Sequence, residues 1–320
     1  MRRKEGWTLP LKILITGGAG YLGSTMTRAF LEEGHAVRVL DSFLFDQDSL
    51  LDCCRNDRFD VVRGDARDEA LLQRLLRDVD VVIALAAIVG APACDRDPVT
   101  ARTLNLDAIS SLLRLRSRQQ LVVFPCTNSG YGVGQEGIFC TEETPLRPIS
   151  LYGRLKVEAE KQILDAGNSV TLRLATVFGV SPRLRLDLLV NDFAYRAWHD
   201  HAIVLFQADF KRNYVHVRDV AAAFAHAVRN AERMSGQPYN FGLSDANLSK
   251  RELCELIREE VPDLHVLESE VGSDPDKRNY IVSNAKIEAT GMRATIPVRQ
   301  GVRELLKAFA IIRPNRFANV

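Results

Sequence analysis

The amino-acid sequence predicts an α/β fold in which a doubly wound parallel sheet is followed by a smaller C-terminal lobe. Three observations support this prediction. Short apolar runs alternate with helical patterns in the first half of the chain, the runs are rich in Val, Ile and Leu at nearly every position, and this rhythm breaks after about residue 175. Strands that are apolar on both faces are typical of a parallel sheet covered by helices on both sides.

The elements follow from the sequence in order. Five strands are expected over residues 11–17, 36–41, 59–65, 79–87 and 120–125. Helices are expected over residues 20–33 and 99–118, and a later helix carries "SLYGRLKVEAE". Charged, loop-rich segments at 181–187, 209–219 and 268–280 then separate further helices, which suits a ligand-binding lobe. We therefore expect a dinucleotide-binding domain over 1–175, with 215–235 returning to it, and a substrate-binding lobe over 176–214 and 236–320.

Composition limits the classes of partner. The 320 residues include 42 basic and 41 acidic side chains, so the net charge of +1 does not favour nucleic acid or an anionic membrane. No apolar run approaches the ~18 residues that span a bilayer. The six cysteines contain no C-x-x-C pair, and His199 and His201 lack a third ligand, so no metal site is expected. These features favour a cytoplasmic protein with reduced, mostly buried thiols.

A glycine-rich loop, "ITGGAGYLG" at residues 15–23, joins the first strand to the first helix. Gly18, Gly20 and Gly23 fit G-x-G-x-x-G, and Gly17 with the last two fits the related G-x-x-G-x-x-G. Such glycines allow a tight turn and a close approach of the backbone to a pyrophosphate, which the helix N-terminus then binds. The strand before and the helix after the loop make this a Rossmann-type dinucleotide site.

Two aspartates end the second and third strands. Asp41 lies 18 residues past Gly23, the last glycine of the loop, where a carboxylate accepts hydrogen bonds from both ribose hydroxyls and repels a 2′-phosphate. NAD is therefore favoured over NADP, the alternative being that Asp41 only caps a helix. Asp65, in "GDARD", has two roles of equal weight: it bonds the adenine amino group, or it caps the helix that starts near Asp68.

The segment "SLYGRLKVEAE" places Tyr152 and Lys156 four residues apart, on one face of a helix. An ammonium group beside a phenol favours the phenolate and lowers the pKa of the tyrosine. We expect Tyr152 to act as a general base toward a substrate hydroxyl while hydride leaves for the cofactor.

Eight motifs taken together resemble one family of enzymes. They are "TGGAGYLG", "LDSF", "GDARD", "ALAA", "TNSGYG", "YGRLK", "RNYVHVRDV" and "YNFG", and they extend over almost the whole chain. The chain resembles an extended short-chain dehydrogenase/reductase of the nucleotide-sugar epimerase/dehydratase group. The resemblance implies that NAD is bound by Gly17, Gly20, Tyr21, Leu22, Asp41, Ser42, Asp65, Ala66, Leu85, Ala86, Ala87, Asn105, Tyr152, Lys156 and Ala175. It also implies a homodimer formed through the helices that carry Asn105 and Tyr152.

On the substrate side, the resemblance implies that Thr127 contacts the reacting sugar oxygen and shares its proton with Tyr152; an ordinary hydroxyl turn is the less favoured alternative. The other expected substrate contacts are Asn128, Ser129, Thr176, Arg185, Asn191, Arg212 and Arg278. Asn128 and Ser129 stand where dehydratases and decarboxylases of the family carry acidic residues, so hydride transfer alone is expected. Thr176 replaces an asparagine that is usual in the family. Arg183 and His216 receive no functional role: the first is expected to be a solvated surface charge and the second a structural histidine.

The segments "IVGAPACDRDP", "LYGRLKVEAEKQILDAGNSVTLRLATVFG", "RLRLDLLVNDFAYRA" and "DPDKRNYIVS" are similar to a narrower group, the GDP-heptose 4-dehydrogenases of bacterial capsule pathways. That similarity implies oxidation of GDP-D-glycero-α-D-manno-heptose at C4, in surface polysaccharide biosynthesis. Two alternatives remain: a 4-epimerase on a UDP- or GDP-sugar with the same residues, and a non-catalytic NAD sensor, against which the intact Thr127, Tyr152 and Lys156 argue.

Overall fold

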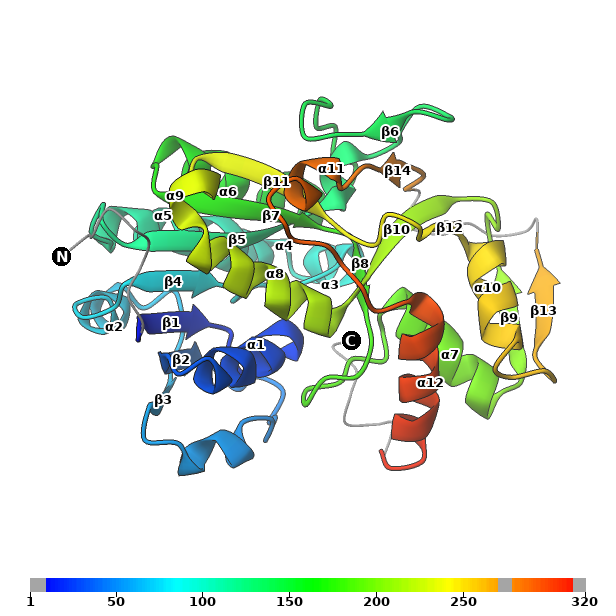
Figure 1. The fold of residues 1–320 in the computed structure, drawn as a ribbon, viewed down its shortest axis with the longest axis horizontal. Coiled ribbons are helices and arrows are strands. Elements are labelled where there is room, and N and C mark those ends of the chain that lie inside the picture. Colours follow the sequence, from blue (N-terminus) through cyan, green and yellow to red (C-terminus); the bar gives the residue numbers. More distant parts are fainter. Residues whose placement is uncertain (1–9, 270–277, 313–320) are drawn as a thin grey trace.

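A computed structural model describes residues 10–269 and 278–312. Its main sheet has seven strands, all parallel, in the order β11-β7-β5-β4-β1-β2-β3 (Figure 1). They are β1 (Lys12–Thr16), β2 (Ala36–Asp41), β3 (Phe59–Arg63), β4 (Val81–Ala84), β5 (Leu121–Thr127), β7 (Ser169–Leu174) and β11 (Gln237–Phe241). Ile13 and Ile15 pack in one apolar core and Leu14 in another, so β1 is buried on both faces as the sequence predicts.

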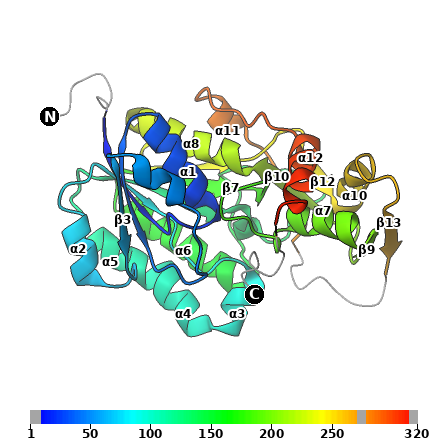
Figure 2. The same ribbon diagram turned by 90° about the horizontal axis from the view of Figure 1, so that it is seen from below.

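Helices cover both faces of this sheet (Figure 2). One face carries α1 (Tyr21–Glu32), α8 (Val217–Arg229) and the short α9 (Ala231–Met234). The other carries α2 (Glu69–Leu75), α3 (Ala91–Arg96), α4 (Pro98–Arg102), α5 (Ala108–Leu115) and α6 (Leu151–Asp165). The helix expected over 99–118 is therefore α4 and α5, joined by a π-helical turn at Thr103–Asp107. The Rossmann-type arrangement is confirmed.

The second lobe lies beside one end of the sheet, on the right of Figure 1. Its largest sheet has β10 (Lys211–His216) in the middle, paired with β8 (Thr176–Phe178) on one side and β12 (Asn247–Ser249) on the other. Two smaller sheets pair β9 (Ala202–Leu205) with β13 (His265–Glu268) and β6 (Phe139–Cys140) with β14 (Ile281–Val282). Its helices are α7 (Leu189–His199), α10 (Lys250–Arg258), α11 (Ala285–Glu288) and α12 (Val298–Phe309). Two 3₁₀ turns, η1 (Leu51–Arg55) and η3 (Asn128–Tyr131), complete the elements that the structure describes.

The expected lobe boundaries differ from the structure at β6, which lies within 1–175 but pairs with β14, and at β11. β11 lies at 237–241, within the range assigned to the second lobe, but it pairs with β7 at the edge of the main sheet. Tyr239 and Phe241 are buried there in the large apolar core. The sequence of β11 does not indicate its partner, because β7 lies far earlier in the chain.

Some expectations about single residues are also settled by burial. His216 is fully buried, and its Nδ1 accepts a hydrogen bond from the backbone N–H of Arg218 at the start of α8. Burial lowers its pKa to about 4, so it is the neutral structural histidine that was expected. All six cysteines are free thiols, and five are buried. Among the described residues, no helix is both long enough and apolar enough to span a bilayer.

A buried ion pair fixes α6 against the sheet. The Glu160 carboxylate accepts hydrogen bonds from Nε of Arg173 on β7 at 2.9 Å and from Oγ1 of Thr171 at 2.8 Å. The Arg173 guanidinium also donates to the hydroxyl of Tyr131 at 3.2 Å, and that hydroxyl donates to Asn240 on β11 at 2.6 Å. This network joins α6, η3, β7 and β11, and so it positions the helix that carries Tyr152.

Candidate active site

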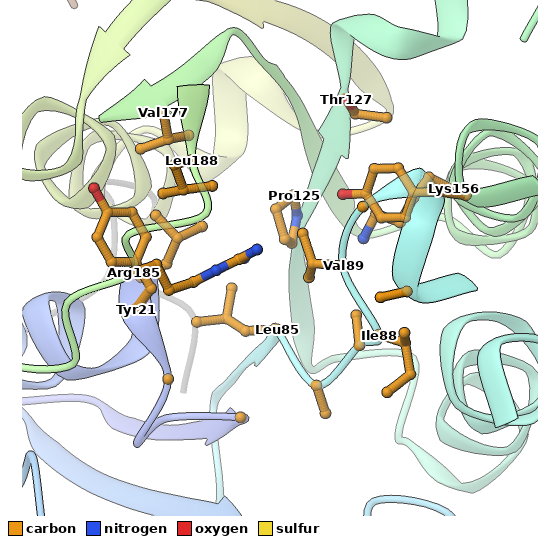
Figure 3. Close-up of a pocket in the computed structure, with 18 of the residues that line it drawn as sticks. Tyr21, Leu85, Ile88, Val89, Pro125, Thr127, Lys156, Val177, Arg185 and Leu188 are labelled. Carbon is orange, nitrogen blue, oxygen red and sulfur yellow. The ribbon is translucent and has the colours of Figure 1, made fainter. Parts of the chain in front are cut away.

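A cavity of about 700 Å³ opens at the carboxyl ends of the parallel strands. In the strand order, β1 and β4 are neighbours from which the chain proceeds in opposite directions, and ligands bind at such a switch point. Figure 3 shows Thr127 and Lys156 on the side of β5 and α6, with Tyr21 and Arg185 opposite them. The glycine loop, the Tyr152 helix and the second lobe therefore meet around one space.

The glycine loop forms a cradle that side chains would fill. Gly17 has φ +72°, and a Cβ at this position would lie 2.8 Å from the backbone nitrogen of Ala86. A Cβ at Gly23 would overlap the carbonyl oxygen of Gly17. The backbone of the loop is thereby free to approach a ligand at the N-terminus of α1, which has no side-chain cap of its own. This geometry fits the pyrophosphate of a dinucleotide.

Asp41 lies at the end of β2 with its carboxylate oriented by the loops around it. One oxygen accepts from the backbone N–H of Ala19 at 2.9 Å, and the other from the N–H of Phe43 at 2.8 Å and the amide of Gln47 at 3.2 Å. Burial raises its pKa, while these hydrogen bonds lower it. The group lines the cavity as an oriented acceptor, in the place expected of a ribose ligand.

The two alternatives for Asp65 are separated by the structure. Asp68, whose carboxylate accepts from the N–H of Leu71, is the N-cap of α2. Asp65 lines the cavity instead, and its carboxylate accepts hydrogen bonds from Arg67, which lower its pKa. The capping alternative for Asp65 is therefore wrong, and its role toward adenine stays a prediction.

Tyr152 and Lys156 both line the cavity, as expected from their spacing on α6. The Lys156 ammonium lies 3.8 Å from the centroid of the Phe124 ring, and burial lowers its pKa to about 8. Burial raises the pKa of Tyr152, and the nearby cations that lower it are Arg185 and Arg278. Burial thus opposes ionisation of the phenol, and the two cations that favour ionisation come from the second lobe. The expected lowering of the Tyr152 pKa by Lys156 stays a prediction.

Thr127 ends β5 and takes part in a short chain of hydroxyl groups. Its Oγ1 accepts from the backbone N–H of Ser129 at 3.1 Å and donates to the Ser129 hydroxyl at 2.8 Å. The less favoured hydroxyl turn is therefore present, and Thr127 lines the cavity as well. Arg278 donates to the Ser129 hydroxyl, so this guanidinium reaches the floor of the site. Cys126 is buried in the apolar core, as its place at the strand end predicts.

Most of the expected ligand residues do line the cavity, but three asparagines do not. Asn105 holds the backbone of Ile88 through two hydrogen bonds of 2.8 Å. Asn191 accepts from the N–H of Gly179 at 3.0 Å and donates to the carbonyl of Arg185 at 2.8 Å. Asn128 is 1% exposed and is not among the residues that line the cavity. In the structure the first two position segments that line the cavity, and the direct binding roles expected of all three stay predictions.

Arg183 is one of the lining residues that sequence reasoning missed. It was expected to be a solvated charge, but it is only 4% exposed, and its guanidinium lies 5.3 Å from the centroid of the Phe45 ring. Phe45 and Asp187 also line the cavity without having been predicted. The alternation of charge in "SPRLRLD" was the available signal, but burial of Arg183 depends on a loop that lies far earlier in the chain.

Comparisons with known proteins agree with this geometry. Residues 13–242 match the model of the NAD dependent epimerase/dehydratase family. The chain is 26% identical over 295 residues to a UDP-glucose 4-epimerase of Lactobacillus helveticus, covering 83% of this chain and 87% of that protein. It is 26% identical over 314 residues to UDP-glucuronic acid decarboxylase 1 of Arabidopsis thaliana, covering 93% of this chain and 70% of that protein.

Among solved structures, a Thermus thermophilus UDP-glucose 4-epimerase in complex with NAD has a TM-score of 0.80 and 26% identity, covering 95% of this chain and all of that one. A Bacillus cereus UDP-glucuronic acid 4-epimerase in complex with UDP-glucuronic acid and NAD has a TM-score of 0.83 at 22% identity, covering 94% and 99% of the two chains. The second likeness supports the fold.

Proposed function

The chain belongs to the NAD-dependent epimerase/dehydratase family, and on this premise we propose that it is a nucleotide-sugar 4-epimerase. One observation carries the proposal: Thr127, Tyr152 and Lys156 line the same cavity as the glycine loop, while Asn128 and Ser129 supply no acid or base. The relatives named as 4-epimerases support C4 as the reacting carbon. These relatives support epimerisation better than dehydrogenation, although the sequence resemblance favours dehydrogenation.

In this proposal NAD, when bound, accepts the hydride from C4 and returns it. The residues of the chain transfer the proton and hold the sugar in position. Tyr152 takes the proton of the C4 hydroxyl and later gives it back. Thr127, whose own proton points toward Ser129 in the structure, would turn that proton to the C4 oxygen, because the single proton of the C4 hydroxyl passes to Tyr152. Arg212 and Arg278 line the cavity from the second lobe and bind the diphosphate, for which guanidinium groups are suited.

A second candidate is oxidation of a GDP-linked heptose at C4 with release of the 4-keto sugar. The segments that resemble GDP-heptose 4-dehydrogenases favour it, and several of them, around Val89–Ala93 and Arg185–Leu189, line the cavity. The two candidates share their first half-reaction and the same residues. They differ only in the fate of the 4-keto sugar. A 4-epimerase turns it within the site and reduces it from the other face, whereas a 4-dehydrogenase releases it.

Product analysis separates these candidates. The purified protein is incubated with UDP-glucose, UDP-glucuronic acid and GDP-D-glycero-α-D-manno-heptose, and the products are resolved by chromatography and mass spectrometry. A 4-epimerase is expected to give a new peak of unchanged mass, whereas a dehydrogenase gives a product lacking two hydrogen atoms together with NADH. Loss of water or carbon dioxide from any substrate would contradict the proposal, because Asn128 and Ser129 cannot supply the required acid or base. Tyr152→Phe serves as the inactive control.

Asp41 is expected to set the choice of NAD over NADP. Asp41→Ala should weaken NADH affinity by about 10- to 100-fold, the range for losing hydrogen bonds to a charged group, and should narrow the gap between NADH and NADPH. Fluorescence titration of both cofactors measures this, and Asp46→Asn is a matched control, because this exposed carboxylate of the same loop does not line the cavity. Equal affinity of the wild type for NADH and NADPH would show that Asp41 does not discriminate.

The family resemblance also supports a homodimer, formed through the helices that carry Asn105 and Tyr152. Isologous dimers are the commonest closed assemblies of soluble proteins. The molar mass in solution, measured by light scattering, tests this part of the proposal.

A further inference from the structure

Two sequence motifs contain residues that the mechanism leaves unused, and these residues meet in the interior of the molecule. Tyr131 comes from "TNSGYG" and Asn240 from "YNFG", and the Tyr131 hydroxyl donates to Oδ1 of Asn240 at 2.6 Å. Tyr131 is 2% exposed and Asn240 is fully buried, and neither is among the residues that line the cavity. Such a hydrogen bond holds together the two segments that carry it, because a buried polar group without a partner is costly.

The amide nitrogen of Asn240 holds two strands of the second lobe, β6 and β14, which pair with each other near the top of Figure 1. Nδ2 of Asn240 donates to the carbonyl of Cys140 on β6 at 3.4 Å and to the carbonyl of Ser283, directly after β14, at 3.2 Å. The backbone N–H of Ser283 also donates to the carbonyl of Cys140, at 3.0 Å. Asn240 therefore joins β6 and β14 to β11 of the main sheet.

The chain around β14 carries two residues into the cavity. Residues 278–284, here called the β14 segment, include Arg278 and Tyr280, which both line the cavity. Arg278 donates to the Ser129 hydroxyl, and the ring of Tyr280 packs edge-on against the ring of Tyr131, with their centroids 6.3 Å apart. The carbonyl that Asn240 holds thus belongs to the same short segment as the guanidinium that reaches the site.

The Tyr131 hydroxyl also connects this segment to the helix of the proposed base. It accepts a hydrogen bond from Arg173 on β7 at 3.2 Å, and Arg173 forms the buried ion pair with Glu160 on α6. A continuous chain of polar contacts therefore runs from α6 to the β14 segment. Its two ends carry the residues assigned to the two parts of the substrate, Tyr152 to the sugar and Arg278 to the diphosphate.

We propose that Tyr131 and Asn240 are positioning residues for substrate binding: their hydrogen bond holds the β14 segment in place and so fixes Arg278 where the diphosphate of the sugar nucleotide binds. This inference rests on the proposed function, in which Arg278 binds that diphosphate. A guanidinium that is already in position loses little freedom when the anion arrives, so more of the interaction contributes to affinity. Tyr131 and Asn240 do not touch the substrate and act through Arg278.

Binding of UDP and GDP, measured by calorimetry, tests the proposal without any turnover. Tyr131→Phe keeps the ring and removes only the hydroxyl. It is expected to weaken binding of the preferred nucleotide by about 3- to 10-fold, the range for one uncharged hydrogen bond. Asn240→Asp should weaken it further, because the carbonyls of Cys140 and Ser283 then face an oxygen. NADH affinity should stay unchanged in both variants, since the glycine loop makes none of these contacts.

Double variants show whether the effect passes through Arg278. Arg278→Met alone should weaken nucleotide binding by about 10- to 100-fold, the range for a hydrogen bond to a charged group. Adding Tyr131→Phe to Arg278→Met should then cause no further loss, because the guanidinium that Tyr131 positions is already absent. Residues that act independently would instead give effects that add.

Gln120 provides a matched control, because it directly precedes β5 at the opposite end of the main sheet from the cavity. Its amide is bonded in the same pattern as that of Asn240. Nε2 donates to the carbonyls of Leu76 and Val79 at 2.6 and 2.9 Å, and Oε1 accepts from the N–H of Ser117 at 2.9 Å. Gln120→Glu should therefore lower the midpoint of thermal unfolding, as Asn240→Asp does, and leave nucleotide affinity unchanged.

Three results would overturn the positioning role alone. Normal nucleotide affinity in both Tyr131→Phe and Asn240→Asp would show that their hydrogen bond does not position Arg278. Equal weakening of nucleotide binding by Gln120→Glu would assign the effect to a general loss of stability. Additive effects of Tyr131→Phe and Arg278→Met would mean that Tyr131 acts by another route. Normal nucleotide binding by Arg278→Met, in contrast, would overturn both this inference and the diphosphate contact in the proposed function.

Discussion

Replacing Tyr152 by phenylalanine is expected to slow hydride transfer by about 10²- to 10⁴-fold, the contribution typical of a positioned general base. The ring of Tyr152 packs beside the apolar core on α6, and phenylalanine keeps that packing. Only the hydroxyl is removed, so the fold and the affinity for NADH should stay unchanged. The rate is measured in a single turnover, from NADH absorbance after mixing enzyme, NAD and nucleotide sugar.

The pH profile distinguishes a base from a mere hydrogen-bond donor. A base acts in its deprotonated form, so the wild-type rate should rise with pH through one ionisation, and that ionisation should be absent from Tyr152→Phe. Burial raises the pKa of Tyr152, which moves this increase in rate to higher pH. Arg185 and Arg278 lower the same pKa and move the increase back toward neutral pH. Lys156→Met should be comparably damaging, and Thr127→Val should cost less, because it removes one oriented hydroxyl and leaves the base.

A second tyrosine provides the control for this experiment. Tyr280 is buried and lines the same cavity, so Tyr280→Phe removes a hydroxyl from the site without removing the proposed base. Its effect on the rate should be small beside that of Tyr152→Phe. If Tyr152→Phe instead keeps near-normal turnover with the wild-type pH profile, Tyr152 is not the base.

Glu160→Ala is expected to lower the free energy of unfolding by about 3–5 kcal/mol, because it leaves the charge of Arg173 buried without its partner. The two side chains are only 3% and 7% exposed. Burial disfavours the charged guanidinium, yet the nearby carboxylate of Glu160 raises the pKa of Arg173 above its ordinary value. Urea unfolding of wild type and variant, followed by fluorescence, measures the difference.

A surface ion pair on the same helix is the control. Lys161 and Asp165 are 74% and 64% exposed, so Asp165→Ala should change the unfolding free energy by less than about 1 kcal/mol. The double variant Glu160→Met with Arg173→Leu should recover most of the loss, since apolar side chains of similar size replace both charges. A small effect of Glu160→Ala, similar to that of Asp165→Ala, would mean that the buried pair does not hold α6 in place.

The sequence alone determined the features that depend on neighbouring residues. The strands of the main sheet up to β5 follow from apolar runs, and the glycine loop follows from a strand that ends directly before a helix. The placement of Tyr152 and Lys156 on one helix follows from their spacing of four residues. In each case a short window contains all the information, because backbone geometry and the helical repeat are local.

Only the tertiary structure decided which polar side chains face the cavity. The amides of Asn105 and Asn191 bond to the backbone of other segments. Arg183, expected in solvent, is buried against Phe45 because two loops far apart in the sequence meet over the cavity. The strand β11 joins the main sheet for the same reason. Burial and hydrogen bonding of a polar group depend on whatever the fold brings next to it, and no window of sequence around that group contains its partner.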